Sequence, residues 1–232
     1  SYTWAKTLTN AGDLLSGGNV GGPRAVYVPG FGLAKEMALA PFHVGHAATF
    51  SGSYDLPFGK GRANLAGANA LTQAILGGWS TNWIMTMYGG QPQTIGCSGG
   101  TTSAGLGCAA FLTGESRYIK SVDRWYNAAA FRQPPVTTQI GQTDLSPLGG
   151  ARTQVIGPPY RKLDFSLFKS FVLREHYRLE FRAESFNLTN TPAFANPSQT
   201  NFLDTNNFGR ITSTRNNPND ARQIQFALKL YF

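Results

Sequence analysis

The sequence predicts an all-β fold, a segment of an antiparallel, up-and-down transmembrane β-barrel with long external loops. Residues 223–232 alternate apolar and polar side chains, which is the period-two pattern of a strand with two unlike faces. Charged residues make up only 14% of the chain, and 16 Phe, 9 Tyr and 4 Trp favour strands. Apolar runs stay short of the roughly 18–20 residues of a membrane helix, so a membrane-spanning chain must pair its strands in a barrel.

Six segments carry a strand pattern, and they follow one another in an order that suits an up-and-down sheet. In the second segment Phe50 and Tyr54 share one face, and in the third Trp79, Trp83 and Met85 do so. The six predicted strands are 1–9, 43–56, 78–88, 160–171, 176–187 and 223–232.

The fifth predicted strand has the clearest separation of faces. Its apolar face, together with Phe226 and Leu228 of the last strand, is expected to meet lipid; it consists of Tyr177, Leu179, Phe181 and Ala183. The opposite face carries four charged side chains, which are Arg178, Glu180, Arg182 and Glu184. We expect this row to face the barrel lumen and to form cross-strand ion pairs with neighbours such as Asp164 and Lys229. A second interpretation is that the row lines a path for a solute.

The connections between the predicted strands differ in length on the two sides of the sheet. If the last strand runs toward the periplasm, residues 172–175 form a short periplasmic turn and 57–77 form a periplasmic link with a short helix at 68–76. The connections 10–42, 89–159 and 189–221 then face outside. Short periplasmic turns and long external loops are typical of outer-membrane barrels.

Aromatic residues gather at the predicted periplasmic ends of these strands, where Tyr and Trp rings settle at a membrane interface. They are Tyr54, Phe58, Trp79, Phe171, Tyr177, Tyr231 and Phe232.

About six strands are fewer than the eight of the narrowest bacterial barrels, so either two more strands lie in the long loops or the chain is part of a larger barrel. The pattern already runs at Ser1-Tyr2-Thr3-Trp4, so we expect residues 1–232 to be one C-terminal part of a larger barrel. Such an incomplete barrel has open sheet edges that invite self-association.

An ordered set of segments resembles the Oar-like TonB-dependent outer-membrane receptors of acidobacterial type. It includes His43-Val44, Tyr54-Asp55-Leu56-Pro57-Phe58-Gly59-Lys60-Gly61-Arg62, Gly77-Gly78-Trp79, Gly89-Gly90-Gln91-Pro92, Trp125-Tyr126-Asn127-Ala128-Ala129-Ala130-Phe131 and segments 163–169, 179–190 and 208–212. The resemblance implies a C-terminal piece of a ~22-stranded barrel that takes up a solute. It also implies that the last strand, with Phe226, Leu228, Leu230 and Phe232, is read by the barrel-assembly machinery.

The resemblance places the chain in the bacterial outer membrane, with lipid, the assembly machinery and an unknown solute as partners. TonB itself is expected to act only through N-terminal parts that this sequence lacks, namely the plug domain and the TonB box. No cofactor is implied.

Two cysteines, Cys97 and Cys108, lie in a Gly/Ser/Thr-rich stretch, and they lack the four ligands of a structural zinc site. In an oxidising compartment they are expected to form a loop disulfide, the alternative being two free thiols. His43 and His46 are three apart and fall on opposite faces of a strand, so no metal site is predicted. The net charge of +8 is scattered rather than clustered, which argues against nucleic-acid binding.

Two other functions fit parts of the sequence. Gly96-Cys97-Ser98-Gly99-Gly100 matches the G-x-S-x-G pattern of a serine hydrolase, in which Ser98 needs a downstream Asp (Asp123, Asp144 or Asp164) and then His176. The pattern should open a helix, but a glycine- and threonine-rich segment follows it. Alternatively, the chain is a soluble β-rich binding or self-assembling module derived from a barrel, since a soluble sheet with one wet face shows the same alternation.

Overall fold

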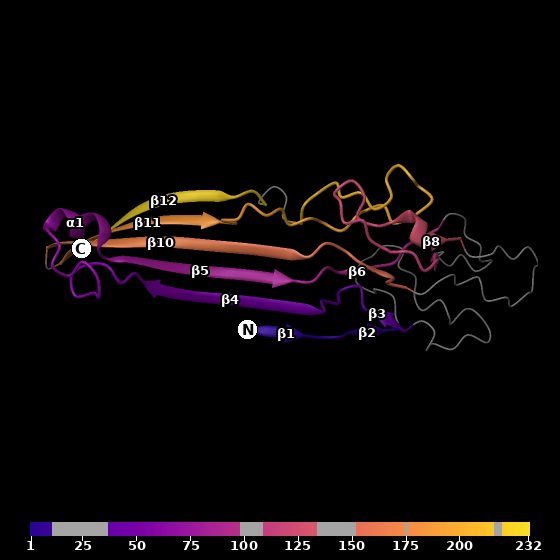
Figure 1. Ribbon diagram of the computed structural model, residues 1–232, viewed down its shortest axis with the longest axis horizontal. Coiled ribbons are helices and arrows are strands. Elements are labelled where there is room, and N and C mark those ends of the chain that lie inside the picture. The colour runs from indigo at the N-terminus through magenta and orange to yellow at the C-terminus, as the bar shows by residue number, and fades with distance from the viewer. Residues whose placement is uncertain (11–36, 98–108, 134–151, 175, 216–219) are drawn as a thin grey trace, which may run out of the picture.

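The computed structural model describes residues 1–10, 37–97, 109–133, 152–174, 176–215 and 220–232. Its main element is a six-stranded antiparallel sheet in the order β1-β4-β5-β10-β11-β12. The strands are β1 (Tyr2–Trp4), β4 (His46–Asp55), β5 (Trp79–Tyr88), β10 (Tyr160–Arg174), β11 (Tyr177–Phe186) and β12 (Gln223–Tyr231). Figure 1 shows these strands side by side, with α1 and the C-terminus at one end and the long connections at the other. All six predicted strands and their up-and-down order are therefore confirmed.

Three predicted boundaries differ from the structure by three residues or more, and one of them is the start of the second strand, which lies at His46 instead of residue 43. The first strand is shorter than 1–9, because its partner β4 begins only at His46, which lies opposite Trp4. After Trp4 the chain leaves the main sheet, and Leu8–Thr9 forms β2, which pairs with β3 (Ala38–Leu39). Conversely, β10 extends past the predicted end at residue 171 to Arg174, with a shift in its register to β11 after Val172.

The register separates the sheet into two chemically different faces, because alternate residues of a strand point to opposite sides. One row across the sheet joins Phe50, Met85 and Leu163, and the adjacent row joins Ser51, Ile84 and Asp164. The apolar face includes Tyr2, Trp4, Phe50, Tyr54, Trp79, Trp83, Met85, Met87, Leu163, Phe165, Leu167, Lys169, Phe171, Tyr177, Leu179, Phe181, Ala183, Phe226, Leu228 and Leu230, and a few polar residues share it, namely His46, Thr81, Arg161 and Ser185. The polar face includes Thr49, Ser51, Ser53, Ser80, Asn82, Thr86, Lys162, Asp164, Ser166, Arg178, Glu180, Arg182, Glu184, Gln225 and Lys229.

Away from the end where α1 lies, much of the apolar face is left uncovered by the rest of the described chain. Phe226 is 71% exposed and Leu228 is 68% exposed, and Trp4, Phe50 and Tyr54 are also exposed. Side chains of this size are normally buried in a water-soluble protein, and a contiguous exposed apolar patch marks a surface that meets another apolar phase.

The sheet has two free edges in the described part of the chain. β1 pairs only with β4, and β12 pairs only with β11. The described sheet is thus an open segment rather than a closed cylinder.

The long connections pack together beyond one end of the sheet, in what we call the loop cluster (the described parts of residues 92–158 and 192–215). Two small ladders organise it, β6 (Pro92–Gln93) with β9 (Val155–Ile156) and β7 (Phe111–Leu112) with β8 (Phe131–Arg132), and the 3-10 helix η3 (Ala128–Ala130) precedes β8. Its buried core consists of Ile95, Ala110, Tyr126, Ala130, Phe131, Val155, Phe202 and Phe208. The described parts of the predicted connection 89–159 therefore contribute to a second core.

A single short helix, α1 (Ala70–Leu76), lies in the link between β4 and β5. The Asn69 side chain caps its first turn by accepting a hydrogen bond from the Thr72 N–H at 2.9 Å. The predicted helix at 68–76 is thereby confirmed to within two residues. Among the described residues, no helix has the length and apolar character needed to cross a membrane.

Candidate functional site

The polar face of the sheet changes in character from one side to the other. On β4 and β5 it is built mostly of small uncharged side chains, such as Ser51, Ser53 and Asn82, with Asp55 and Ile84 as exceptions. On β10 to β12 it carries charged side chains of both signs. A solute that moves along this face would meet hydrogen-bonding groups on one half and paired charges on the other.

The four charged residues predicted to form a row on β11 do lie on this polar face. Glu180 and Arg182 form an ion pair at 2.5 Å. The Arg182 guanidinium also lies 5.1 Å from the centre of the Phe168 ring. Arg178 lies 4.4 Å from the centre of the Tyr231 ring, so the row is held by rings as well as by charges. Glu184 accepts a hydrogen bond from the Gln225 amide at 2.6 Å.

The ion pairs on this face run along strands rather than across them, which differs from the prediction. Glu180 lies opposite Lys229 in the register, yet its carboxylate pairs with Arg182. Asp164 pairs with Lys162 of its own strand at 3.1 Å. Residues two apart in a strand share a face, so long side chains reach each other as readily as the opposite strand.

Asp164 also fixes the outer end of β11, where the chain turns toward the loop cluster. Its carboxylate accepts a hydrogen bond from the Asn187 N–H at 2.8 Å. Asn187 has φ of 53°, a left-handed conformation that asparagine tolerates well. Its side-chain amide donates to the Thr191 carbonyl at 3.0 Å and to the Asp220 carbonyl at 2.7 Å, so it ties both ends of this connection together.

Tyr126 lies at the centre of the loop cluster and is fully buried. Its ring is in contact distance of the Phe208 and Tyr118 rings, and its hydroxyl donates to the Gln93 side chain at 2.5 Å. Burial raises the pKa of Tyr126 well above its ordinary value, and the neighbouring Tyr118 adds to the shift. Tyr126 therefore serves as a neutral packing residue, and no sequence pattern other than the family resemblance had marked it.

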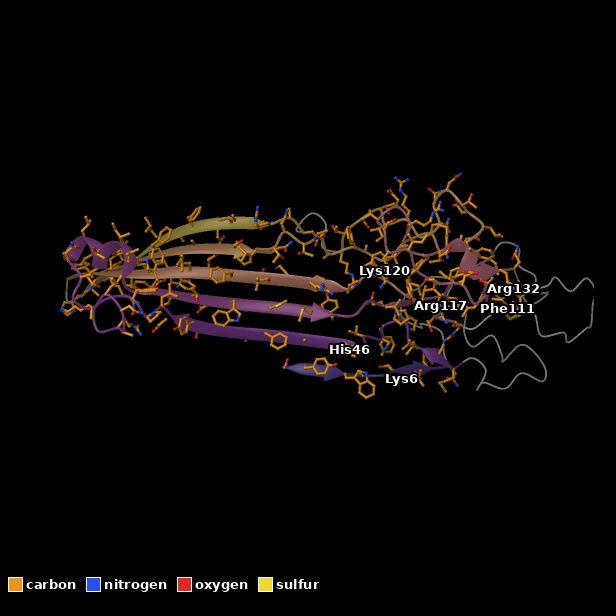
Figure 2. The ribbon with its side chains drawn as sticks, in the orientation of Figure 1. Lys6, His46, Phe111, Arg117, Lys120 and Arg132 are labelled. Carbon is orange, nitrogen blue, oxygen red and sulfur yellow. The ribbon has the colours of Figure 1, made fainter. Side chains whose placement is uncertain are left out.

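The loop cluster carries basic side chains, among them Arg117, Lys120 and Arg132, which Figure 2 labels; the Arg117 guanidinium donates to the Gln154 carbonyl at 2.7 Å. Arg132 lies 5.0 Å from the centre of the Phe111 ring, and Lys120 lies 5.9 Å from the centre of its neighbour Tyr118. Rings beside cations offer both stacking and charge to a ligand that arrives from outside.

The residues required by the serine hydrolase interpretation are not brought together in the described part of the chain. Asp164 lies near the start of β10, whereas His176 is exposed beyond the end of the same strand. Ten strand residues between them correspond to roughly 30 Å. Asp123 lies in the loop cluster, at the end of the molecule opposite His176. Ser98 and Asp144 lie outside the described residues.

Cys97 is joined in a disulfide and packs against the core of the loop cluster. Its predicted partner Cys108 lies outside the described residues, so the Cys97–Cys108 pairing stays a prediction.

The histidines do not form a metal site in the described chain, which holds no group of three His, Cys, Asp or Glu side chains suited to an ion. His43 is buried, and its ring nitrogen accepts a hydrogen bond from the Thr7 N–H at 3.2 Å. His46 is exposed on the apolar face, stacks on the Tyr2 ring and shares a 2.7 Å hydrogen bond with its hydroxyl.

The residues predicted to form the assembly signal share one face of the last strand. Phe226, Leu228 and Leu230 are exposed on the apolar face, and Phe232 follows the strand at 92% exposure. Recognition of these side chains by the assembly machinery stays a prediction.

The comparisons with known proteins agree with this geometry. The family model described as "Outer membrane beta barrel domain" matches residues 1–225. Neither the curated proteins nor the solved structures gave a match.

Proposed function

This chain belongs to the outer membrane beta barrel domain family and lies in the bacterial outer membrane, and from that premise we propose that it forms part of the wall of an Oar-like TonB-dependent transporter. The apolar face of the sheet meets lipid, and the polar face borders a passage through which a solute enters the periplasm. The loop cluster makes the first contact with that solute.

The observation that carries this proposal is the separation of the two faces across the six strands, with exceptions such as Lys169 and Arg161 on the apolar face and Ile84 on the polar face. Phe50 and Ser51 are neighbours in β4 but belong to different rows of the sheet. Phe50 shares its row with Met85 and Leu163, whereas Ser51 shares its row with Ile84 and Asp164. A barrel wall with lipid outside and water inside requires this alternation on every strand. If the inner face of the wall were permanently packed against an apolar plug, it would not need ion pairs such as Glu180–Arg182.

The placement of the connections supports the same orientation. The turn between β10 and β11 and the C-terminus lie at one end of the sheet, and the loop cluster lies at the other (Figure 1). Outer-membrane barrels keep short turns on the periplasmic side and long loops outside. In the receptors that this chain resembles, TonB acts on N-terminal parts, so residues 1–232 contribute the passage rather than the energy coupling.

Energised uptake separates a TonB-dependent transporter from a passive pore. Cells that express the full-length protein are supplied with a panel of labelled solutes, namely ferric siderophores, a corrinoid and oligosaccharides. We expect at least one solute to accumulate, and we expect a protonophore or the loss of TonB to abolish its accumulation. Accumulation that survives both treatments would mean a passive pore, and failure of every solute would mean that the barrel does not import these classes.

A matched pair of variants tests which face borders the passage. Ser51→Cys and Phe50→Cys place a thiol on adjacent residues of one strand, and both native side chains are exposed. A membrane-impermeant thiol reagent should modify Ser51→Cys and block the uptake, because water fills the passage. The same reagent should leave Phe50→Cys unmodified and its uptake intact; equal modification of both positions would show that the polar face borders no water-filled passage.

A further inference from the structure

Helix α1 presents apolar side chains to its surroundings although it belongs to the described fold. None of its residues is buried. Leu71 is 70% exposed and Ile75 is 57% exposed, and residues four apart in a helix share one face. A helix of this length is marginal by itself in water, so its position depends on contacts with the rest of the chain.

The hydrogen bonds between the end of α1 and the sheet come from the apolar face, while the Gln73 side chain ties the helix to the preceding link through the Leu65 carbonyl. Lys169 lies on that face, opposite Trp79 on one side and Phe181 on the other. Its ammonium donates to the carbonyl oxygen of Ile75 at 3.3 Å and to that of Gly77. The Trp79 indole N–H donates to the same Ile75 carbonyl at 2.8 Å. The C-terminal end of α1 is therefore tied to the lipid-facing side of the sheet and not to the passage.

Lys169 is a costly residue on a face that meets lipid, and its contacts explain how it is tolerated. The side chain is only 3% exposed. Its ammonium lies 5.1 Å from the centre of the Trp79 ring and 5.2 Å from that of Phe171, and the carbonyls at a helix C-terminus favour a cation. The end of α1 thus shields the Lys169 ammonium from lipid. The same hydrogen bonds hold α1 against the sheet.

The level of α1 along the sheet is that of the membrane boundary. Trp79, Phe171 and Tyr177 lie on the apolar face at this end, together with Tyr54. Aromatic side chains in such a band mark the interface between hydrocarbon and headgroups. The exposed apolar side chains of α1 therefore continue the surface that already meets lipid.

From these contacts we propose that α1 is an interfacial anchor, which lies on the periplasmic leaflet of the outer membrane and inserts Leu71 and Ile75 among its phospholipids. Lys169 acts as a positioning residue that holds the helix at this depth. Apolar area that enters the headgroup and acyl boundary strengthens membrane binding, as it does for other interfacial helices. This inference rests on the barrel fold and is independent of whether the protein transports a solute.

Depth-dependent quenching tests the insertion directly. The full-length protein carries an environment-sensitive fluorophore on Leu71→Cys or Ile75→Cys and is placed in vesicles of phosphatidylethanolamine and phosphatidylglycerol that include spin-labelled lipid. Phe226→Cys serves as the lipid-facing reference and Ser121→Cys as the water-facing reference, and protein without an added cysteine gives the background. We expect the lipid nitroxide to quench positions 71 and 75 as it quenches 226, and a water-soluble quencher to reach only position 121.

Two results would overturn the proposal. Quenching of positions 71 and 75 from the water would place the helix in the periplasm. Protection from both quenchers would show that α1 is covered by protein, either another segment or a partner.

Lys169→Met tests the positioning role, because methionine keeps the length and apolar stem of lysine but cannot donate to the two carbonyls. We expect position 71 to lose its quenching by lipid in this variant while position 226 keeps it. Lys169→Arg, which still donates, should restore the lipid quenching in part. If Lys169→Met leaves position 71 at the same depth, Lys169 does not hold the helix; if that variant does not fold, the labels in the unaltered background still decide whether α1 is inserted.

Discussion

The indole ring of Trp83 lies directly over Gly52 of the neighbouring strand, in the space where a side chain at position 52 would begin. The two residues face each other in the register of β4 and β5, on the apolar face of the sheet. An aromatic ring over a strand glycine covers backbone that would otherwise be exposed. This contact makes position 52 one of the most size-sensitive places on that face.

Gly52→Ala should therefore destabilise the barrel. The new methyl group collides with the ring atoms of Trp83, and overpacking of this kind costs about 1–3 kcal/mol. The midpoint of thermal unfolding in detergent, followed by heat-modifiable migration on a gel, measures the effect. Gly67→Ala is the matched control, because a methyl group there meets no atom within 4 Å. Equal midpoints for the two variants would show that Trp83 moves aside at no cost.

Tyr126→Phe should weaken the loop cluster at neutral pH and remove part of its sensitivity to alkali. The variant loses the hydrogen bond to Gln93 in a buried site, at a cost of about 1–2 kcal/mol. The folded pKa of Tyr126 is raised, so its stabilising effect is complete below the ordinary tyrosine pKa near 10 and is lost as the pH rises above it. Near-ultraviolet circular dichroism during unfolding at pH 8 and pH 11 measures both effects. Tyr177→Phe, at an exposed position, should still lose stability at alkaline pH. A wild-type protein that loses no stability between pH 8 and pH 11 would contradict the prediction.

Asp204 should make the same cluster sensitive to acid. Several hydrogen-bond donors lower the pKa of Asp204, and the Asn207 side chain, 3.2 Å from the carboxylate, has the largest effect. A lowered folded pKa means that the stabilising effect is present above the ordinary aspartate pKa near 4 and is lost as the pH falls through the folded value. Asp204→Asn should be less stable at pH 7 and should lose less on acidification, whereas Asp123→Asn in the same cluster should follow the wild type. Unfolding midpoints at pH 7 and pH 3 decide this.

The Cys97–Cys108 disulfide should be found in protein isolated without reductant. Peptide mapping before and after reduction should show the two cysteine-containing peptides joined, with no free thiol at Cys97. Cys97→Ser should lower the stability of the loop cluster by up to about 3 kcal/mol, as expected for a loop of this length. Mapping that joins Cys97 to any other thiol would contradict the pairing.

The sheet could be predicted from the sequence because each of its strands carries its own evidence. The alternation of Arg178, Glu180 and Arg182 with Leu179 and Phe181 needs no partner to be recognised. The boundaries were harder, because the end of β1 is decided by where β4 begins and not by any residue of the first strand.

The loop cluster could not be predicted in the same way. Its core joins Ile95, Tyr126, Val155 and Phe208, which no local period connects. The tie between Lys169 and α1 was equally invisible, since it depends on the register that brings Lys169 opposite Trp79. The residues that make such tertiary contacts follow no periodic pattern, so the contacts cannot be recognised from the sequence.

The contacts within the loop cluster also predict the order in which the parts of the protein fold. Even the longest connection within the sheet closes between Tyr88 and Tyr160, whereas the core around Tyr126 needs residues from Ile95 to Phe208 at the same time. Contacts between residues far apart in sequence form late, because the chain between them must first be ordered. We therefore expect the loop cluster to fold after β5, β10 and β11 have paired. The sheet then acts as the template on which the loop cluster folds.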